Sequence, residues 1–338
     1  MNPFGHGWHL NRSAFEELLR ETAINGAQSD DHPLCGLVKG RMTQIDRNVD
    51  GTWILSASVP LDSTSLATFH GRWIVDATGR KASVATKVSV QLSWAVSAYN
   101  RRCTKSRILQ LGARIVKFDP LLAFYAVFEA CTLSSASSNA QDTDTDHRTL
   151  IEAIPEGWFY SSLVPSYSPA DCITTRVVVF HTHPSHPAAK VARRRDGSSF
   201  LDLVHGSTTH ISSILRDHAY ELPPGGQAPV CTAAGSSYLD KPCDMKERWN
   251  AVGDAAMAFD PLSSQGMMTA LEMGYCVGTL LGAHLLQTDT DGSYMYAGGD
   301  TGLEQIYSRV RGEYNVHRAY YYSLGKKRFP NEQFWNIV

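Results

Sequence analysis

The spacing of apolar residues changes along the chain, from helical near the start to strand-like in the middle and back to helical towards the end. A first helix of about three turns is predicted by apolar residues at helical spacing, namely Phe15, Leu18, Leu19 and Ala23. Ser13 to Glu16 has the form of a capping box, which marks a helix start. We expect this helix to pack its apolar face against a sheet.

Short runs rich in β-branched and aromatic residues then predict strands. A meander is expected over residues 37–45, 52–59 and 72–75, with Asp50-Gly51 as a hairpin turn. A second set predicts an antiparallel sheet with one substrate-facing side, over residues 121–131, 149–153, 158–163 and 174–180. The polar run 134–146 has no periodicity and predicts a surface excursion between two of these strands.

The C-terminal part returns to helical spacing. Helices are predicted over residues 200–217, 267–286 and 302–324, with a loop over 288–300 and a short apolar strand over 248–252. The chain therefore divides into three segments, 1–90, 91–246 and 247–338. The fold class predicted is α/β with mixed α+β character, in which the middle segment is an inserted antiparallel-sheet domain.

The stretch from Gly253 to Leu271 carries the clearest chemistry, because it joins a strand end, an acidic turn and a helix start. Gly253 allows a tight turn that lets the Asp254 carboxylate face a polyol hydroxyl. Gly266 opens an apolar helix whose free N–H groups and positive dipole end point back towards that turn. These parts suit the ribityl chain, the pyrophosphate and the ring edge of FAD.

A family resemblance rests on these residues. Gly253-Asp254-Ala255-Ala256, followed by Asp260-Pro261 and Gly266, resembles the second FAD motif of the para-hydroxybenzoate hydroxylase and flavin-dependent halogenase superfamily. The resemblance implies an FAD-binding Rossmann-like lobe formed by residues 1–90 and 247–338, with a substrate domain between them. It also implies which residues of the second motif contact the cofactor: Gly253, Asp254, Pro261, Gln265, Gly266 and Met267.

Two further segments extend the resemblance. Asp76-Ala77-Thr78-Gly79-Arg80 resembles the strand end that precedes the family's substrate domain, which implies that Asp76 and Gly79 lie at the cofactor. Gly7 to Phe15 resembles the start of the helix that carries an FAD-contacting arginine. The corresponding residue here is Arg12, whose guanidinium suits a pyrophosphate.

A third segment bears on the reaction. Gly157 to Pro165 resembles the Gly-Trp-x-Trp-x-Ile-Pro signature of the halogenases, but Tyr160 replaces the second Trp and two extra residues precede Pro165. This departure favours the halogenase-like relatives that are monooxygenases or oxidoreductases. Trp158, Tyr160 and Phe180 are candidates for a substrate pocket over the flavin, and core packing of a sheet is the alternative role for each.

One expected motif is absent from the sequence. The family's first βαβ unit carries a Gly-x-Gly-x-x-Gly turn for the ADP pyrophosphate, and no such turn occurs here. The chain therefore resembles a family member that is N-terminally incomplete. A truncated gene product is the favoured explanation, and a genuine fragment that needs a partner or has lost catalysis is the alternative.

Composition limits which other functions and locations are compatible with the chain. With 31 basic and 33 acidic residues the formal net charge is −2, so no nucleic-acid partner is expected. No apolar run reaches about 18 residues and no signal peptide is evident, so we expect no membrane span and a cytoplasmic location. The histidines in the run 181–187 are interpreted as part of a polar loop, and no metal site is predicted.

The sequence thus predicts an FAD-dependent oxidoreductase, and a monooxygenase is the first hypothesis. It would use molecular oxygen to hydroxylate a small organic substrate, and NAD(P)H or a flavin reductase would supply electrons. A flavin-dependent halogenase is the alternative within the enzyme class. A non-catalytic flavoprotein remnant or an interaction subunit is the alternative from another class.

Overall fold

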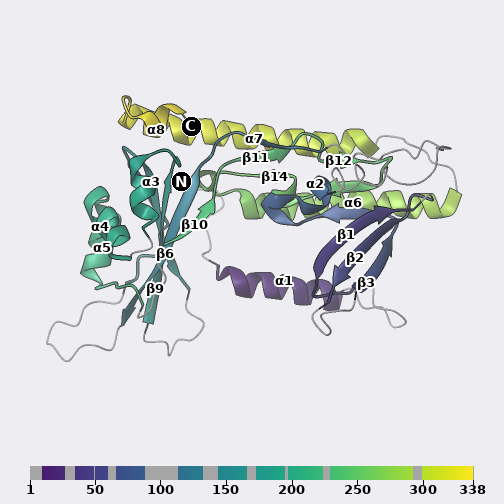
Figure 1. Cartoon of the computed structure of the whole chain (residues 1–338), viewed down its shortest axis with the longest axis horizontal. Coiled ribbons are helices and arrows are strands. Elements are labelled where there is room, and N and C mark those ends of the chain that lie inside the picture. Colours follow the sequence, from purple (N-terminus) through teal and green to yellow (C-terminus); the bar gives the residue numbers. More distant parts are fainter. Residues whose placement is uncertain are drawn as a thin grey trace, which may run out of the picture. The chain divides into compact units, whose positions relative to one another are not determined.

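A computed structural model of the 338-residue chain shows two compact units (Figure 1). One, here called the sheet unit, comprises Met1–Leu37, Pro120–Ala234 and Tyr322–Val338. The other, here called the motif unit, comprises Val38–Asp119 and Gly235–Tyr321. The structure describes residues 10–26, 35–48, 50–59, 66–87, 113–131, 144–165, 173–194, 197–223, 229–291 and 299–337.

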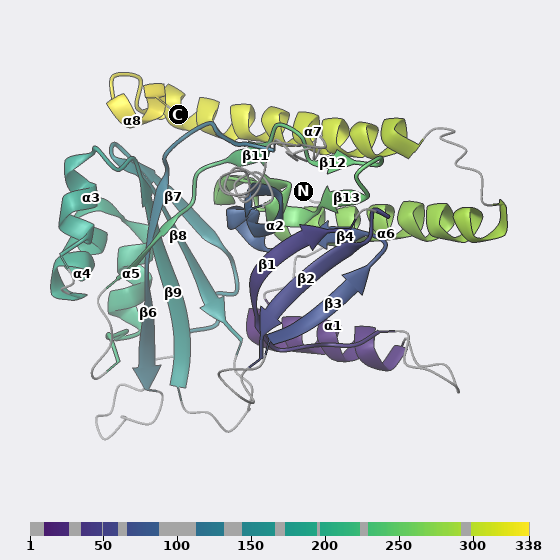
Figure 2. The same cartoon turned by 45° about the vertical axis from the view of Figure 1, so that its right-hand side comes forward.

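The sheet unit is built on a five-stranded antiparallel sheet with the strand order β10-β6-β9-β8-β7 (Figure 2). The four strands predicted for this region are all present. A fifth, β10, was not predicted. The strands are β6 (Leu122–Cys131), β7 (Leu150–Ile154), β8 (Gly157–Val164), β9 (Ile173–Thr182) and β10 (Val230–Ala233).

Three helices cover one face of this sheet: α3 (Pro187–Ala192), α4 (Gly197–Ser207) and α5 (His210–Asp217). Phe124, Phe159 and Phe180 of the strands meet Phe200 and Ile211 of the helices in one buried core. The predicted single helix over 200–217 is wrong, because the chain breaks at Thr208 and Thr209. The Glu152 carboxylate explains the break, since it accepts hydrogen bonds from three successive backbone N–H groups at the start of α5.

The motif unit contains a meander and two small sheets. The meander is β1 (Arg41–Arg47), β2 (Trp53–Ser58) and β3 (Leu66–Gly71), so the first two predicted strands are confirmed. β3 was missed because most of its residues are exposed and show no apolar alternation. The small sheets have the orders β14-β11-β5 and β12-β13-β4, and their strands are β4 (Ile74–Asp76), β5 (Ile115–Lys117), β11 (Ser237–Leu239), β12 (Cys243–Asp244), β13 (Trp249–Ala251) and β14 (Met257–Ala258).

Long helices complete the motif unit. α6 (Gly266–Asp291) and α7 (Gly299–Arg328) confirm the two predicted C-terminal helices, and each is longer than predicted. Met273 and Val277 of α6 and Tyr307 and Tyr314 of α7 are buried with Trp249 of β13 in one core. Short elements fill the turns: α2 (Ser83–Lys87) and the 3-10 helices η1 (Gly79–Lys81), η3 (Gly253–Ala255) and η4 (Pro261–Ser263).

The two ends of the described chain are helical. α1 (Arg12–Gly26) confirms the predicted first helix, but the predicted capping box is wrong, because the Asn11 side chain accepts from the Ala14 N–H at 3.4 Å. None of its residues is buried, so the expected packing of its apolar face is not seen in the described part of the chain. At the other end, α8 (Gln333–Ile337) is anchored by Trp335, whose indole N–H donates to the Ile154 carbonyl at 2.8 Å. Within the ranges described, no helix combines the length and the apolar character needed to cross a membrane.

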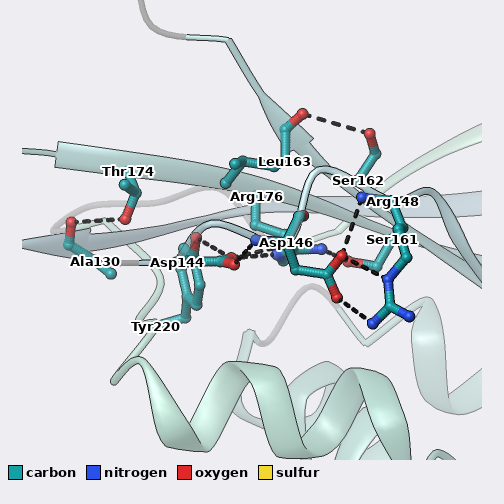
Figure 3. A network of polar contacts seen from close by, with 10 residues as sticks. All are labelled: Ala130, Asp144, Asp146, Arg148, Ser161, Ser162, Leu163, Thr174, Arg176 and Tyr220. Atoms are coloured by element: carbon teal, nitrogen blue, oxygen red, sulfur yellow. Dashed lines mark hydrogen bonds and ion pairs between the residues drawn. The ribbon is translucent and has the colours of Figure 1, made fainter. Parts of the chain in front are cut away.

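A buried ion pair lies on the helix-covered face of the five-stranded sheet (Figure 3). Arg176 of β9 and Asp144 are both fully buried, and the Arg176 Nη2 and Asp144 Oδ2 atoms are 2.7 Å apart. The Tyr220 hydroxyl donates to the same carboxylate at 2.8 Å, and Arg176 also reaches the Asp146 carbonyl at 2.8 Å. The predicted surface excursion over 134–146 is therefore wrong at Asp144, because a buried guanidinium requires a carboxylate; residues 134–143 lie outside the described residues.

We expect Asp144→Ala to lower the free energy of unfolding by about 3 to 5 kcal/mol, since it leaves the Arg176 charge buried without its partner. Urea unfolding followed by tryptophan fluorescence measures the loss. Arg148→Ala is the matched control, because it removes an exposed ion pair with Asp146 and should cost about 1 kcal/mol or less. Equal losses in the two variants would contradict the assignment of Asp144–Arg176 as a stabilising pair.

The same pair predicts a dependence on pH. Burial raises the pKa of Asp144, but hydrogen bonds from the Asp146 N–H, Arg176 and Tyr220 outweigh it and hold that pKa below the ordinary value of 3.8. A carboxyl with a lowered pKa in the folded state stabilises the fold above its unfolded-state pKa and loses that effect as the pH falls through the folded-state value. The stability difference between the native chain and Asp144→Asn should therefore be constant above about pH 5 and shrink below 3.8. Urea unfolding across pH 2.5 to 7 (about half-unit steps) tests this, and a difference that grows in acid would contradict it.

Candidate functional site

Two motifs far apart in the sequence meet in the motif unit. β4 and β13 run parallel, with Trp249 paired to Ile74, Asn250 to Val75 and Ala251 to Asp76. The Val252 N–H extends the pairing by donating to the Asp76 carbonyl at 2.9 Å. Both motifs leave the carboxyl ends of these strands, which is where parallel sheets place their ligand sites. The structure therefore brings Asp76 and Gly79 together with Gly253 and Asp254.

Asp76 holds the first turn together. Its side chain is buried, and one carboxylate oxygen accepts from the Thr78 N–H and hydroxyl at 2.9 and 2.6 Å. The other oxygen accepts from the Val84 and Ala85 N–H groups at the start of α2, at 3.0 and 2.9 Å. Gly79 comes next in this turn with a φ of +70°, a value that favours glycine. Asp76 thus acts on the site by fixing the shape of this turn.

Arg80 ties the two motifs to each other, a role that the sequence did not predict. Its guanidinium donates to the Phe259 carbonyl at 2.7 Å and to the Gly235 carbonyl. Its Nε atom lies 3.5 Å from Oδ2 of Asp254. The only signal in the sequence was its place at the end of the first motif. Both side chains of this pair remain partly exposed.

Gly253 and Asp254 form the second turn, in η3. Gly253 has a φ of +55°, and a Cβ atom placed there would lie 3.2 Å from the Cβ of Ala270 on α6. Glycine therefore allows η3 to approach the second turn of α6. The Asp254 side chain remains 39% exposed beside Arg80.

A further turn leads into α6 and contains three predicted site residues. The Asp260 carboxylate accepts from the Leu262 N–H at 2.8 Å and caps η4, which begins at Pro261. The chain then passes through Ser264, with a φ of +52°, and Gln265, whose Nε2 lies 3.0 Å from Nδ1 of His317 on α7. Gly266 opens α6, and no atom lies within 4 Å of where its Cβ would be.

The start of α6 is suited to an anionic or electron-rich group. It is 26 residues long, and the N–H groups of its first turn have no partner within the helix. Met267 is exposed there, and its neighbour Met268 is more so. The positive end of the α6 helix dipole also favours negative charge at this terminus. The structure thus places Gly266 and Met267 at an accessible helix N-terminus next to η4.

Two tyrosines of α7 fasten the turns. The Tyr307 hydroxyl donates to the Ala251 carbonyl at 2.6 Å, and the Tyr314 hydroxyl accepts from the Asp260 N–H at 3.3 Å and meets the Ser236 hydroxyl. Tyr314 also stacks on Phe259, with ring centroids 4.3 Å apart. Burial raises the pKa of Tyr307 far above its ordinary value and that of Tyr314 to about 12, so both remain neutral at physiological pH.

The remaining predicted site residues lie in the sheet unit. Arg12 is exposed near the start of α1, where it pairs with Glu16 at 2.6 Å. Trp158 and Tyr160 share one face of the sheet, as alternate residues of β8 do. Phe180 is on the other face, where it stacks on Phe159 with centroids 4.6 Å apart. The structure does not bring Phe180 together with the other two.

The histidine run also differs from its interpretation as a polar loop. His181 and Thr182 are buried residues of β9, because the strand continues two residues past its predicted end. His183 and His186 lie in the turn before α3, and the His186 side chain caps that helix by accepting from the Ala188 N–H. Across the described ranges, no group of three or more His, Cys, Asp or Glu side chains is arranged to hold a metal ion.

Comparison with known proteins supports the resemblance. No protein-family model matches the chain. Over 195 residues the chain is 25% identical to the putative FAD-dependent oxidoreductase LodB of Marinomonas mediterranea, a match that covers 57% of this chain and 45% of LodB.

Solved structures share the fold. The flavin-dependent halogenase CmlS matches with a TM-score of 0.65 and 16% identity, over 100% of this chain and 51% of CmlS. The peptidyl tryptophan dihydroxylase QhpG matches with a TM-score of 0.56 and 16% identity, over 97% of this chain and 58% of QhpG. The chain thus spans about half the length of these relatives. The predicted fold class is confirmed: the chain has the fold of the flavin-dependent halogenases and FAD-dependent hydroxylases.

The residues at the two turns fit FAD. The Asp254 carboxylate can accept from a ribityl hydroxyl, and the Arg80 guanidinium can donate to a phosphate. There is open space at Gly266, and the N–H groups at the start of α6 suit the edge of a flat, electron-rich ring. The donor set of the motif unit therefore agrees with the cofactor that the sequence predicted.

We expect Gly253→Ala to lower the free energy of unfolding by about 1 to 2 kcal/mol, because alanine is strained at a positive φ and its Cβ would crowd Ala270. Gly274→Ala is the control. Gly274 lies within α6 with no atom within 4 Å of its Cβ position, so alanine should stabilise that helix by about 0.5 to 1 kcal/mol. Urea unfolding of both variants checks the opposite signs, and a neutral Gly253→Ala would contradict the close approach of η3 to α6.

Proposed function

We propose that this chain is an FAD-dependent oxidoreductase, and that its reaction is the hydroxylation of a small organic substrate. The observation that carries the proposal is the meeting of Arg80, Asp254 and the start of α6 at the carboxyl ends of two parallel strands. Similarity to LodB, a putative FAD-dependent oxidoreductase, supports the same class.

Each part of the site has a proposed role. Asp254 accepts a hydrogen bond from the ribityl chain, and Arg80 is a candidate for the phosphates. Pro261 and Gln265 border the ring, and the backbone N–H groups of Gly266 and Met267 stabilise negative charge on it. Bound FAD would supply the redox chemistry, so that one atom of O₂ enters the substrate, the other leaves as water, and NAD(P)H or a partner reductase provides two electrons. Asp76 and Gly253 keep these groups in position.

Hydroxylation is preferred to halogenation because Tyr160 stands where the halogenase signature has its second Trp. The Gln265-Gly266 turn resembles the turn that holds the halide in the halogenases. Assays of the FAD-loaded chain with and without bromide separate the two: a brominated product would replace the hydroxylation proposal with the halogenase one. The chain covers 45% of LodB and 51% of CmlS, so the activity of the whole protein is part of the proposal.

FAD binding by the purified chain is the direct test. We expect binding that Asp254→Ala weakens by about 10- to 100-fold, the loss expected for a hydrogen bond to a charged group. Asp254→Asn should lose less, since its amide oxygen can still accept. Flavin fluorescence quenching gives the dissociation constants.

Glu272→Ala is the matched control for this test. It removes one carboxylate from the exposed surface of α6, where Glu272 pairs with Arg309, and should leave FAD affinity unchanged. A folded chain that binds no FAD, or that binds it equally well as Asp254→Ala, would contradict the proposed function and favour a non-catalytic role.

A further inference from the structure

A cavity of about 300 Å³ lies inside the motif unit, between α7 and the segment 238–243, which runs from β11 to β12. Figure 1 and Figure 2 both show β11 and β12 beside α7. Small-molecule sites in proteins have volumes from about 300 Å³ upwards. The described residues that line the cavity include none of those predicted to contact FAD, so the cavity is a separate feature of the molecule.

The wall of this cavity combines buried apolar residues with exposed polar ones. Leu239 and Met257 are buried. Glu304, Ser308 and Arg311 are exposed residues of α7. They follow one another by four and three positions, so they lie on one face of the helix, and that face is turned to the cavity. A molecule in the cavity would therefore meet both apolar surface and charged groups.

Aromatic rings hold the Arg311 side chain in place. Its Cζ atom lies 4.1 Å from the centroid of the Tyr238 ring and 5.9 Å from that of Phe118, and the two rings have centroids 5.0 Å apart. A guanidinium over a ring is ordered by this contact, while its N–H groups remain free to donate sideways. Among the described residues, Arg311 has no hydrogen-bond or ion-pair partner. The rings thus fix an open donor fork at the cavity.

Other charged residues of the cavity wall have partners in the fold. Lys241 pairs with Asp244, and the Asp240 carboxylate accepts from a backbone N–H at 2.7 Å. Within the described ranges, the charges at the cavity that lack an ion pair are those of Glu304 and Arg311. They are opposite in sign and two turns apart on α7, which is about 10 Å along the helix.

We propose that this cavity binds a small zwitterionic molecule, with a carboxylate at one end and an ammonium group at the other. The carboxylate accepts hydrogen bonds from the Arg311 fork, and the ammonium group donates to the Glu304 carboxylate. The apolar chain between these two groups lies against Leu239 and Met257. Ser308 stands between the two charges on α7 and offers a further hydrogen bond. Binding at this site does not require bound FAD.

Compounds with the same six-carbon chain test the proposal: 6-aminohexanoate, hexanoate, which lacks the ammonium group, and hexylamine, which lacks the carboxylate. We expect 6-aminohexanoate to bind the full chain in a saturable manner in isothermal titration calorimetry. Hexylamine should bind at least about 10-fold more weakly, because it cannot use the donor fork. Hexanoate should bind about 3- to 5-fold more weakly, the loss expected for an exposed ion pair.

Substitutions assign each end of the molecule to its residue. Arg311→Met keeps an apolar chain but removes the fork, and should weaken both 6-aminohexanoate and hexanoate by at least about 10-fold. Arg311→Lys keeps the charge without the planar fork, so it should lose less than Arg311→Met. Glu304→Gln should weaken 6-aminohexanoate by about 3- to 5-fold and leave hexanoate bound at least as tightly as before.

Arg309→Met is the matched control, because Arg309 is another exposed arginine of α7 and pairs with Glu272. It should leave the affinity for 6-aminohexanoate unchanged. Equal losses in Arg309→Met and Arg311→Met would overturn the site, as would a folded chain that shows no saturable binding of 6-aminohexanoate. Inorganic phosphate is the last probe: phosphate that binds as tightly as 6-aminohexanoate would replace the zwitterion site with a general anion site.

Discussion

The parallel pairing of β4 with β13 is the contact on which the candidate site depends. It involves three residue pairs and one further hydrogen bond from Val252 to Asp76, yet it joins segments about 175 positions apart in the chain. Parallel strands direct the turns at their carboxyl ends to the same edge of a sheet. This pairing brings the Arg80 Nε and Asp254 Oδ2 atoms to within 3.5 Å of each other.

The turns that leave these strands are held by backbone contacts from charged and hydroxyl side chains. Asp76 accepts from three N–H groups and one hydroxyl, Arg80 donates to two carbonyls, and Tyr307 and Tyr314 reach the turns from α7. All of these bonds except the one from the hydroxyl to Asp76 satisfy a backbone group that a tight turn would otherwise leave unpaired. The Asp254 carboxylate and the first turn of α6 can therefore stay accessible on a rigid support.

The sequence predicted the features that depend on local pattern. Strands with clear alternation, both long C-terminal helices and the turn at Gly253 were found because period and glycine chemistry act within a few residues. The features it missed depend on distant partners. Glu152 accepts from the N–H groups at the start of α5, Asp144 is buried because Arg176 is, and Arg80 contacts carbonyls more than 150 positions away. The face on which Phe180 lies is set by the register, which a one-residue shift reverses.

Buried polar groups on the two faces of the five-stranded sheet differ in how many hydrogen-bond partners they have. On the helix-covered face, the groups around Arg176 have partners: Asp144 meets the guanidinium and Tyr220, and Ser161 and the Asp146 carbonyl meet the rest of it. On the opposite face, Nε1 of Trp158 and Nδ1 of His181 have none among the described residues. A buried charge thus has several hydrogen-bond partners on one face, because leaving it unpaired there would cost far more than leaving an indole N–H unpaired on the other.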